Sequence, residues 1–174
     1  MTATADPLPD RPRDAAGSRP DPAGILIRAA GAADMPAVAE LRWRWSVDEG
    51  GVAPVTDPAG YVAAIAAFAA AHPRSHGCHV AERDGVVVGL AWLALTDRPP
   101  TPDDLSRVAG DVQSVYVIPE LRGSGTGSRL VAALLDDARA AGCRYVRVHS
   151  SPRAIPLYAR AGFAVDETYR VVRL

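Results

Sequence analysis

The chain has 174 residues, enough for one domain with a substantial core, and its 48% content of hydrophobic residues is ordinary for a globular protein. A net charge of −1 gives no argument for a nucleic-acid or membrane partner, and because all 19 basic residues are arginine, each arginine says less about function than usual. Two cysteines make no disulfide framework, and no signal-peptide core or membrane-length apolar stretch is present, so we expect a cytoplasmic location.

The first part of the chain predicts an arm, a strand and two helices. Residues 1–23 are rich in Pro, Asp, Arg and Ala, which predicts a flexible arm before a single domain at 24–174. Residues 25–28 predict a first strand, and Asp34 is placed to cap a helix that runs to Trp45. The pair Asp57-Pro58 then predicts the start of a second helix, which runs to about Ala71.

The middle of the chain predicts a hairpin and the strand before a glycine-rich loop. Asp84-Gly85 is a strong hairpin signal between strands at 78–82 and 86–95, and the second strand is so apolar that we expect it at the centre of the sheet. Residues 96–110 predict a loop, and residues 111–117 the next strand.

The last third predicts alternating helices and strands. A helix from about Gly127 to Gly142 is followed by a strand at 143–149, a short helix at 154–161, and a terminal hairpin of strands at 163–165 and 168–174. The order β-α-α-β-β-β-α-β-α-β-β predicts a mixed sheet with helices on its faces.

The loop between the strand at 111–117 and the next helix is suited to an anion. Gly123, Gly125 and Gly127 permit positive φ and leave no Cβ in the way of a ligand, and the first amides of the helix have no intrahelical partner. A pyrophosphate fits such a loop, although a glycine-rich turn without a ligand stays open on the loop alone. The glycine spacing excludes the dinucleotide fingerprint, and a chain without lysine has no P-loop.

Two segments together resemble one protein family. The pattern Val115-Tyr116-Val117-x-Pro119-x-x-Arg122-Gly123-x-Gly125-x-Gly127 resembles the acetyl-CoA motif of the GNAT N-acetyltransferases, whose signature is Gln/Arg-x-x-Gly-x-Gly/Ala. The segment 154–163 resembles the family's A-x-x-x-Y-x-x-x-G-F pattern. Many members have asparagine where this chain has Ser151, whose hydroxyl reaches less far. The resemblance covers residues 25–174.

The resemblance implies a fold and a cofactor. The fold is an α/β GNAT fold with a mixed, mostly antiparallel twisted sheet of about seven strands and about four flanking helices. The cofactor is acetyl-CoA, from which the family transfers an acetyl group to a primary amine. The residues implied for cofactor binding are Val115, Tyr116, Val117, Arg122, Gly123, Ser124, Gly125, Thr126, Gly127, Ser128, Ser151, Ala154 and Tyr158.

The resemblance also implies catalytic residues. Tyr158 is the candidate general acid, because in similar proteins this tyrosine lies beside the cofactor sulfur; packing against the sheet is the alternative. Asp111 is the candidate general base, because strand alternation places it on one face with Val115 and Val117, barring a bulge. The competing bases are Asp48, Glu49 and His149, and ordered water can also serve.

The family binds its acceptor with the first two helices and the loop between them. Here these supply Trp43, Trp45, Asp48, Glu49 and Tyr61, and aromatic rings beside carboxylates suit a cationic amine, with a solvated helix face as the alternative. Trp43 and Trp45 cannot share a helical face, so we expect one in the core and the other beside a pocket.

No metal is expected. The cluster His72, His76, Cys78 and His79 does not predict a site, because Pro73 breaks helical pairing and Cys78 and His79 point to opposite faces of a strand.

The leading hypothesis is an N-acetyltransferase that acts on a small-molecule amine by direct attack in a ternary complex. The alternatives are a protein N-terminal or lysine acetyltransferase and a non-catalytic acyl-CoA-binding sensor. Similar proteins are often dimers, so the resemblance also suggests a homodimer.

Overall fold

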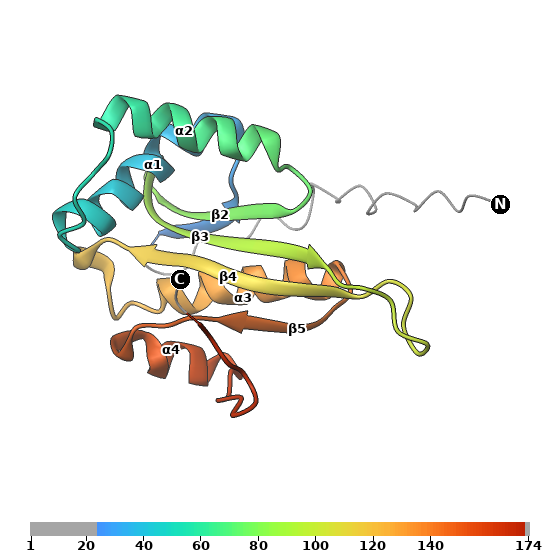
Figure 1. The fold of residues 1–174 in the computed structure, drawn as a ribbon. Helices are drawn as coiled ribbons and strands as arrows, with labels where there is room; N and C mark the ends of the chain where they lie inside the picture. Colours follow the sequence, from blue (N-terminus) through green and yellow to red (C-terminus); the bar gives the residue numbers. More distant parts are fainter. Residues whose placement is uncertain (1–23, 173–174) are drawn as a thin grey trace.

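The computed structural model describes residues 24–172, and the arm expected at 1–23 lies outside them. One sheet has the strand order β1-β2-β3-β4-β5, in which all neighbours are antiparallel except β4 and β5 (Figure 1). The strands are β1 (Ile25–Ala29), β2 (His76–Arg83), β3 (Val86–Asp97), β4 (Val108–Val117) and β5 (Cys143–Val148). The α-helices are α1 (Met35–Trp43), α2 (Pro58–Ala71), α3 (Thr126–Ala140) and α4 (Ile155–Arg160). The mixed sheet flanked by four helices confirms the predicted fold class, with five strands in the described residues instead of about seven.

The β2–β3 hairpin is confirmed. Asp84 and Gly85 have φ values of 52° and 78°, the positive values that a two-residue hairpin turn requires. The third strand lies at the centre of the sheet, as its apolar sequence predicts, and residues 88–95 are all buried.

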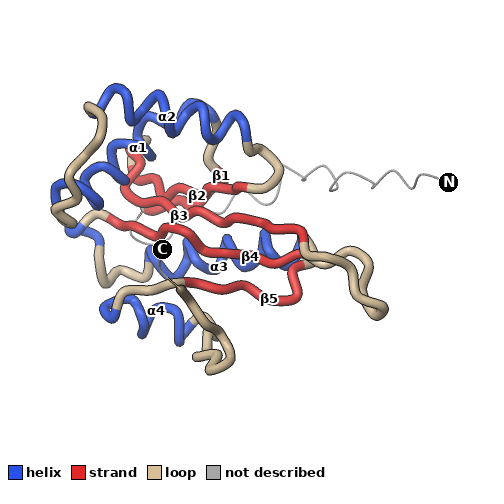
Figure 2. The backbone as a smooth tube through the Cα atoms, viewed as in Figure 1, coloured by secondary structure: helices blue, strands red, loops and turns tan. Residues whose placement is uncertain are grey.

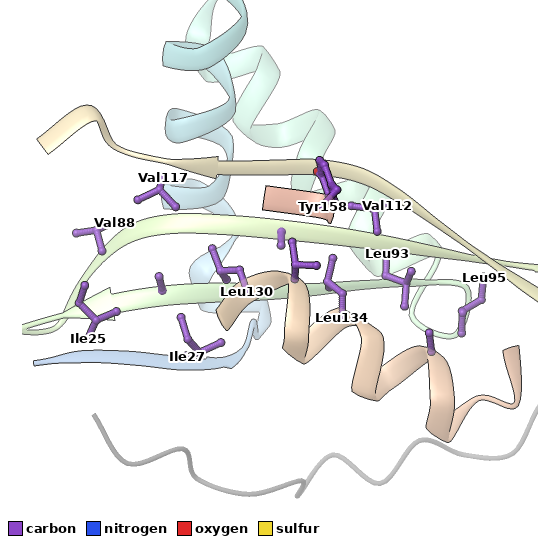
Figure 3. Close-up of a cluster of buried hydrophobic side chains, with 14 of the residues drawn as sticks. Ile25, Ile27, Val88, Leu93, Leu95, Val112, Val117, Leu130, Leu134 and Tyr158 are labelled. Atoms are coloured by element: carbon purple, nitrogen blue, oxygen red, sulfur yellow. The ribbon is translucent and has the colours of Figure 1, made fainter. Parts of the chain in front are cut away.

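Helices cover both faces of the sheet (Figure 2). On one face α3 packs over a cluster that includes Ile27, Leu93, Val112, Leu130 and Leu134, and Tyr158 of α4 joins it (Figure 3). On the other face α1 packs over a second cluster, whose buried members are Met35, Val38, Cys78, Val80, Leu90, Trp92 and Tyr116. The α2 helix packs on α1 and has no buried residue of its own. The side chains on the two faces of β4 therefore pack in different layers, one under α3 and the other under α1.

The two predicted helix caps differ in outcome. Asp57 caps α2 as expected, because its Oδ1 accepts a hydrogen bond from the Gly60 amide at 2.7 Å. Asp34 does not cap α1. Its carboxylate instead accepts hydrogen bonds from the Arg28 guanidinium and the Gly31 amide, each at 2.7 Å. Asp34 thereby ties β1 to the turn before α1.

Replacing Asp34 with asparagine should lower the free energy of unfolding at pH 7 by about 1–3 kcal/mol, because the half-buried Arg28 loses one of its two charged acceptors. Hydrogen bonds from Arg28 hold the pKa of Asp34 below its ordinary value. The stability from this pair is therefore present above the unfolded-state pKa of about 4 and is lost as the pH falls through the folded-state pKa. Urea unfolding at pH 7 and pH 3 should show the difference from wild type shrinking at the lower pH.

The control for this experiment is Asp136→Asn. Asp136 pairs with Arg139 at the surface, where the two side chains are 75% and 70% exposed, so its loss should change stability little. An equal loss in both variants, or a loss at Asp34 that grows toward low pH, would contradict the assignment.

The predicted C-terminal hairpin is wrong for the described residues. Residues 163–172 form no strand, and residues 173–174 lie outside the described part. Asp166 forms a local turn, in which its Oδ1 accepts hydrogen bonds from the Thr168 amide at 2.9 Å and hydroxyl at 2.6 Å. A β-type sequence needs a partner strand, and here Val171 and Val172 remain 68% and 78% exposed.

Candidate active site

The two parallel strands at one side of the sheet separate part of the way along. Their last paired residues are Val112 of β4 and Val148 of β5. From there to Val117, β4 pairs only with β3 among the described strands. Its outer backbone edge is therefore open to an extended ligand that adds itself as a strand.

A β-bulge marks the point where the strands separate. Trp92 of β3 lies opposite Ser114, and the next residue, Leu93, lies opposite Val112, so Gln113 has no partner on β3. The extra residue reverses the alternation of side chains. Val112 and Val115 consequently both face α3, although they are three residues apart.

The bulge corrects the expected position of Asp111. Because Val112 faces α3, its neighbour Asp111 faces α1 and α2, on the opposite side from Val115 and Val117. The carboxylate of Asp111 lies 3.6 Å from Nε of Arg147 on β5. The shared face from which its role as base was argued is wrong, and the role itself stays a prediction.

The glycine-rich loop ends at the start of α3. Gly123 and Gly125 have φ values of 83° and 88°, and a Cβ on either would meet no atom of residues 24–172 within 4 Å. The space in front of both residues is therefore open. No side chain caps α3, so its first amides keep their hydrogen-bonding capacity. Open space, positive-φ glycines and an uncapped helix N-terminus fit a pyrophosphate group.

The other polar residues of the loop support its shape. Ser124 Oγ donates to the Leu121 carbonyl and lies 2.7 Å from Oγ1 of Thr126, which is 1% exposed. Gly127 is in the first turn of α3, where a Cβ would lie 3.7 Å from Leu157 of α4. The start of α3 thus lies beside α4, the helix that carries Tyr158.

The ring of Tyr158 is buried, whereas its hydroxyl makes no hydrogen bond to a described residue. Its side chain is 7% exposed and belongs to the cluster under α3 (Figure 3). Its ring packs edge-to-face on Phe163, with 5.4 Å between the ring centroids. The hydroxyl bonds no described residue and is not among the fully buried atoms without a partner, so solvent reaches it. Burial raises the pKa of Tyr158, which keeps the hydroxyl protonated at neutral pH. The group can therefore hold a proton for donation.

The remaining predicted cofactor residues lie around α4. Ser151 is exposed before the short turn at Pro152–Ala154, and its hydroxyl caps nothing. Ala154 is half-buried against the cluster under α3. Their contacts with a cofactor stay predictions.

The predicted acceptor residues divide between two places. Trp43 packs on Tyr61 with 5.7 Å between ring centroids, and both line a cavity of about 130 Å³ between α1 and α2. Trp45 stacks on Tyr116 at 6.2 Å and is 38% exposed, and Asp48 is also exposed. The expectation of one core tryptophan is wrong, since neither ring is buried.

Comparison with known proteins decides the family. The sequence model described as "Acetyltransferase (GNAT) family" matches residues 35–163, most of the described domain. The chain belongs to the GNAT acetyltransferase family. The family is one of acetyltransferases.

Relatives of this GNAT chain are similar over part of their length. Glucosamine 6-phosphate N-acetyltransferase of Trypanosoma brucei brucei is 33% identical over 90 residues, 52% of this chain and 58% of that protein. Mycothiol acetyltransferase of Sanguibacter keddieii is 37% identical over 87 residues, 48% of this chain and 27% of that protein. The matched region thus spans less than two thirds of either relative.

A solved structure shows the same fold. It is a predicted acetyltransferase from Clostridium acetobutylicum, determined with acetyl-CoA. It superposes with a TM-score of 0.70 at 21% identity and covers 86% of this chain and 96% of its own.

Glu49 joins β4 to the glycine-rich loop of this GNAT domain. Its Oε1 accepts a hydrogen bond from the Tyr116 hydroxyl at 2.6 Å, and its Oε2 accepts one from Arg122 Nη2 at 2.8 Å. Bonds from Tyr116 and Arg122 hold the pKa of Glu49 below its ordinary value. A carboxylate with both oxygens engaged is a poor general base, so this geometry disfavours Glu49 as the base.

Arg122, like Glu49, is held by contacts with its neighbours in the protein. Its Nε donates to the Val117 carbonyl at 3.0 Å, and its guanidinium lies 5.4 Å from the centre of the Tyr116 ring. From the sequence, we expected Glu49 to contact the acceptor and Arg122 to contact the cofactor. In the structure the two side chains bond to each other. A contact of Arg122 with the cofactor stays a prediction.

Sequence reasoning missed Arg42 and Ser114. Arg42 of α1 donates from Nη1 to the hydroxyl of Ser114, which is 4% exposed on β4, and from Nε to the Tyr61 hydroxyl at 3.2 Å. In a chain whose basic residues are all arginine, no local signal distinguishes this one.

The described residues also bear on the metal and membrane predictions. Between residues 24 and 172, no three His, Cys, Asp or Glu side chains gather as metal ligands. His79 lies 3.0 Å from Asp137 of α3, whereas Cys78 faces α1, so the two point to opposite faces as predicted. Within the same residues, no helix is long and apolar enough to cross a membrane.

Proposed function

We propose that this GNAT chain transfers the acetyl group of acetyl-CoA to the primary amine of a small molecule, by direct attack in a ternary complex. The observation that carries the proposal is the separation of β4 from β5 beside the uncapped start of α3. It brings a free strand edge next to an anion cradle. A small acceptor is supported by the relatives named for glucosamine 6-phosphate and mycothiol.

The glycine-rich loop and the open edge of β4 bind different parts of the donor. When bound, acetyl-CoA supplies the activated acetyl group. The backbone amides of residues 123–128 hold the pyrophosphate, as an open helix N-terminus does. The outer edge of β4 at Val115 and Val117 binds the pantetheine arm as an added strand. A backbone N–H beside the bulge at Gln113 polarises the thioester carbonyl.

The reaction needs a proton donor for the leaving thiolate and a base for the attacking amine. Tyr158 holds a proton at Oη and gives it to the leaving thiolate, which its raised pKa supports. Asp111 faces α1 and α2, the layer that carries the predicted acceptor residues, and acts as base directly or through ordered water. Glu49 takes no part as base, because Tyr116 and Arg122 occupy its oxygens.

Thiol release from acetyl-CoA over a panel of acceptors tests the proposal. The panel holds small primary amines, peptides with a free N-terminus and peptides with an internal lysine. We expect acceptor-dependent release with at least one small amine. Release with peptides alone would favour a protein acetyltransferase. Binding of acetyl-CoA without release on any acceptor would favour the acyl-CoA sensor.

A further inference from the structure

Arg42 is a half-buried cation whose hydrogen-bond partners are both neutral. Its two bonds go to the hydroxyls of Tyr61 and Ser114, and no described carboxylate pairs with it. Partial burial of a guanidinium is unfavourable when only hydroxyls compensate the lost hydration. The arrangement leaves a positive charge unbalanced between α1, α2 and β4.

Four other partly buried arginines pair with acids, unlike Arg42, whereas Arg107 donates to the Pro99 carbonyl. Arg28 pairs with two carboxylates, and Arg44 and Arg122 both pair with Glu49. Arg147 lies beside Asp111. A carboxylate therefore lies beside each of these four arginines, whereas no described carboxylate pairs with Arg42.

The guanidinium of Arg42 also keeps a free donor. Its Nη2 bonds no described residue, and it is not among the fully buried polar atoms without a partner. Solvent therefore reaches Nη2. A guanidinium fixed at Nε and Nη1 presents Nη2 in a set direction, which suits a charged hydrogen bond to an oxygen of a carboxylate or phosphate.

The position of Arg42 connects this charge to the reaction. Ser114, which it contacts, directly follows the bulge residue Gln113, where β4 separates from β5. Tyr61, its other partner, lines the cavity between α1 and α2 together with Trp43. Arg42 thus lies between the predicted acceptor residues and the strand edge that receives the thioester.

We propose that Arg42 binds an anionic group, a carboxylate or a phosphate, on the acceptor amine. The acceptor class is then a small molecule that carries both a primary amine and an anion. The inference rests on the proposed function and adds to it the residue that selects the acceptor. Its Nη2 donates to an anion oxygen, while Ser114 and Tyr61 hold the guanidinium in place.

Matched acceptor pairs test the inference. The phosphate pair is glucosamine 6-phosphate and glucosamine, and the carboxylate pair is alanine and alaninamide. With wild type we expect the anionic member of at least one pair to have the higher kcat/KM. Arg42→Gln should lower that kcat/KM by about 10- to 100-fold, the loss expected for a charged hydrogen bond, and leave the neutral member within about twofold.

Two further variants separate recognition from folding. Arg42→Lys keeps the charge without the planar fork and should retain part of the preference. Arg139→Gln changes an arginine that is 70% exposed on α3 and should retain all of it. An equal loss for both members of each pair in Arg42→Gln, or an unchanged ratio, would overturn the inference.

A binding measurement keeps the two proposals distinguishable. Inorganic phosphate is titrated calorimetrically into protein saturated with coenzyme A, so that the glycine-rich loop is already occupied. Wild type should bind phosphate at least about tenfold more tightly than Arg42→Gln. Equal or absent phosphate binding in the two proteins would overturn the anion site. Phosphate binding without thiol release on any amine would overturn only the proposed function.

Discussion

Tyr158→Phe should lower kcat by about 100- to 10,000-fold, the range that a general acid contributes. The phenylalanine keeps the ring that packs on Phe163, and the hydroxyl has no described partner to leave unsatisfied. Stability should therefore stay within about 0.5 kcal/mol of wild type. Acetyl-CoA affinity should also change little. Steady-state thiol release, calorimetric binding and urea unfolding measure the three quantities.

The pH profile gives this prediction a second readout. Because burial raises the pKa of Tyr158, its acid form persists through neutral pH and is lost only at a pH above about 10. The wild-type kcat should fall there, and the residual kcat of the variant should not. Tyr145→Phe, at a residue 44% exposed on β5, is the matched control and should keep full activity. Full turnover in Tyr158→Phe would remove the proposed acid.

Gly125→Ala should weaken acetyl-CoA binding at least tenfold. Gly125 has a φ of 88°, so alanine there adds strain of about 1–2 kcal/mol. A Cβ at this position meets no described protein atom within 4 Å and extends into the space that we assign to the pyrophosphate. Calorimetric titration with coenzyme A measures the affinity.

Gly142→Ala separates ligand contact from backbone strain. Gly142 follows the other end of α3, has a φ of 73°, and also has open space where a Cβ would be. The end of the helix lies about 22 Å from its start at 1.5 Å per residue. Both variants should lose similar stability, and only Gly125→Ala should lose affinity. An equal loss of coenzyme A affinity in both would place the effect in the stability of α3.

Short-range signals account for the parts of the fold that the sequence predicted. Asp84-Gly85 determines its hairpin because positive φ is needed at two adjacent residues. Asp57-Pro58 determines a helix start through one side-chain bond to Gly60. The glycine-rich loop before α3 is likewise local, since its backbone angles follow from its own residues.

Features that depend on pairing between distant residues were not predictable. The bulge at Gln113 exists only in the register of β4 against β3, and it alone decides which face Asp111 takes. The terminal residues 168–172 have a β-type sequence, but Asp166 forms a turn and no described strand pairs with them. A β-type sequence alone does not form a strand when no neighbouring strand is there to pair with it.

The same distinction applies within the site. The motif predicted a cofactor loop and the acid Tyr158 from patterns of neighbouring residues. The Glu49–Arg122 pair joins residues 73 positions apart, and the Arg42–Ser114 contact joins residues 72 apart. Such contacts depend on how α1 lies over the sheet. We therefore predicted other roles for Glu49 and Arg122 from the sequence, and none for Arg42.

The most direct test of the donor site is a crystal structure of the protein with acetyl-CoA bound. We expect the pyrophosphate on the amides of residues 123–128 and the pantetheine arm along the edge of β4 that β5 leaves open. The thioester sulfur should lie within about 3.5 Å of the Tyr158 hydroxyl. A cofactor bound away from this edge, or a sulfur out of reach of Tyr158, would contradict both the assigned site and the proposed acid.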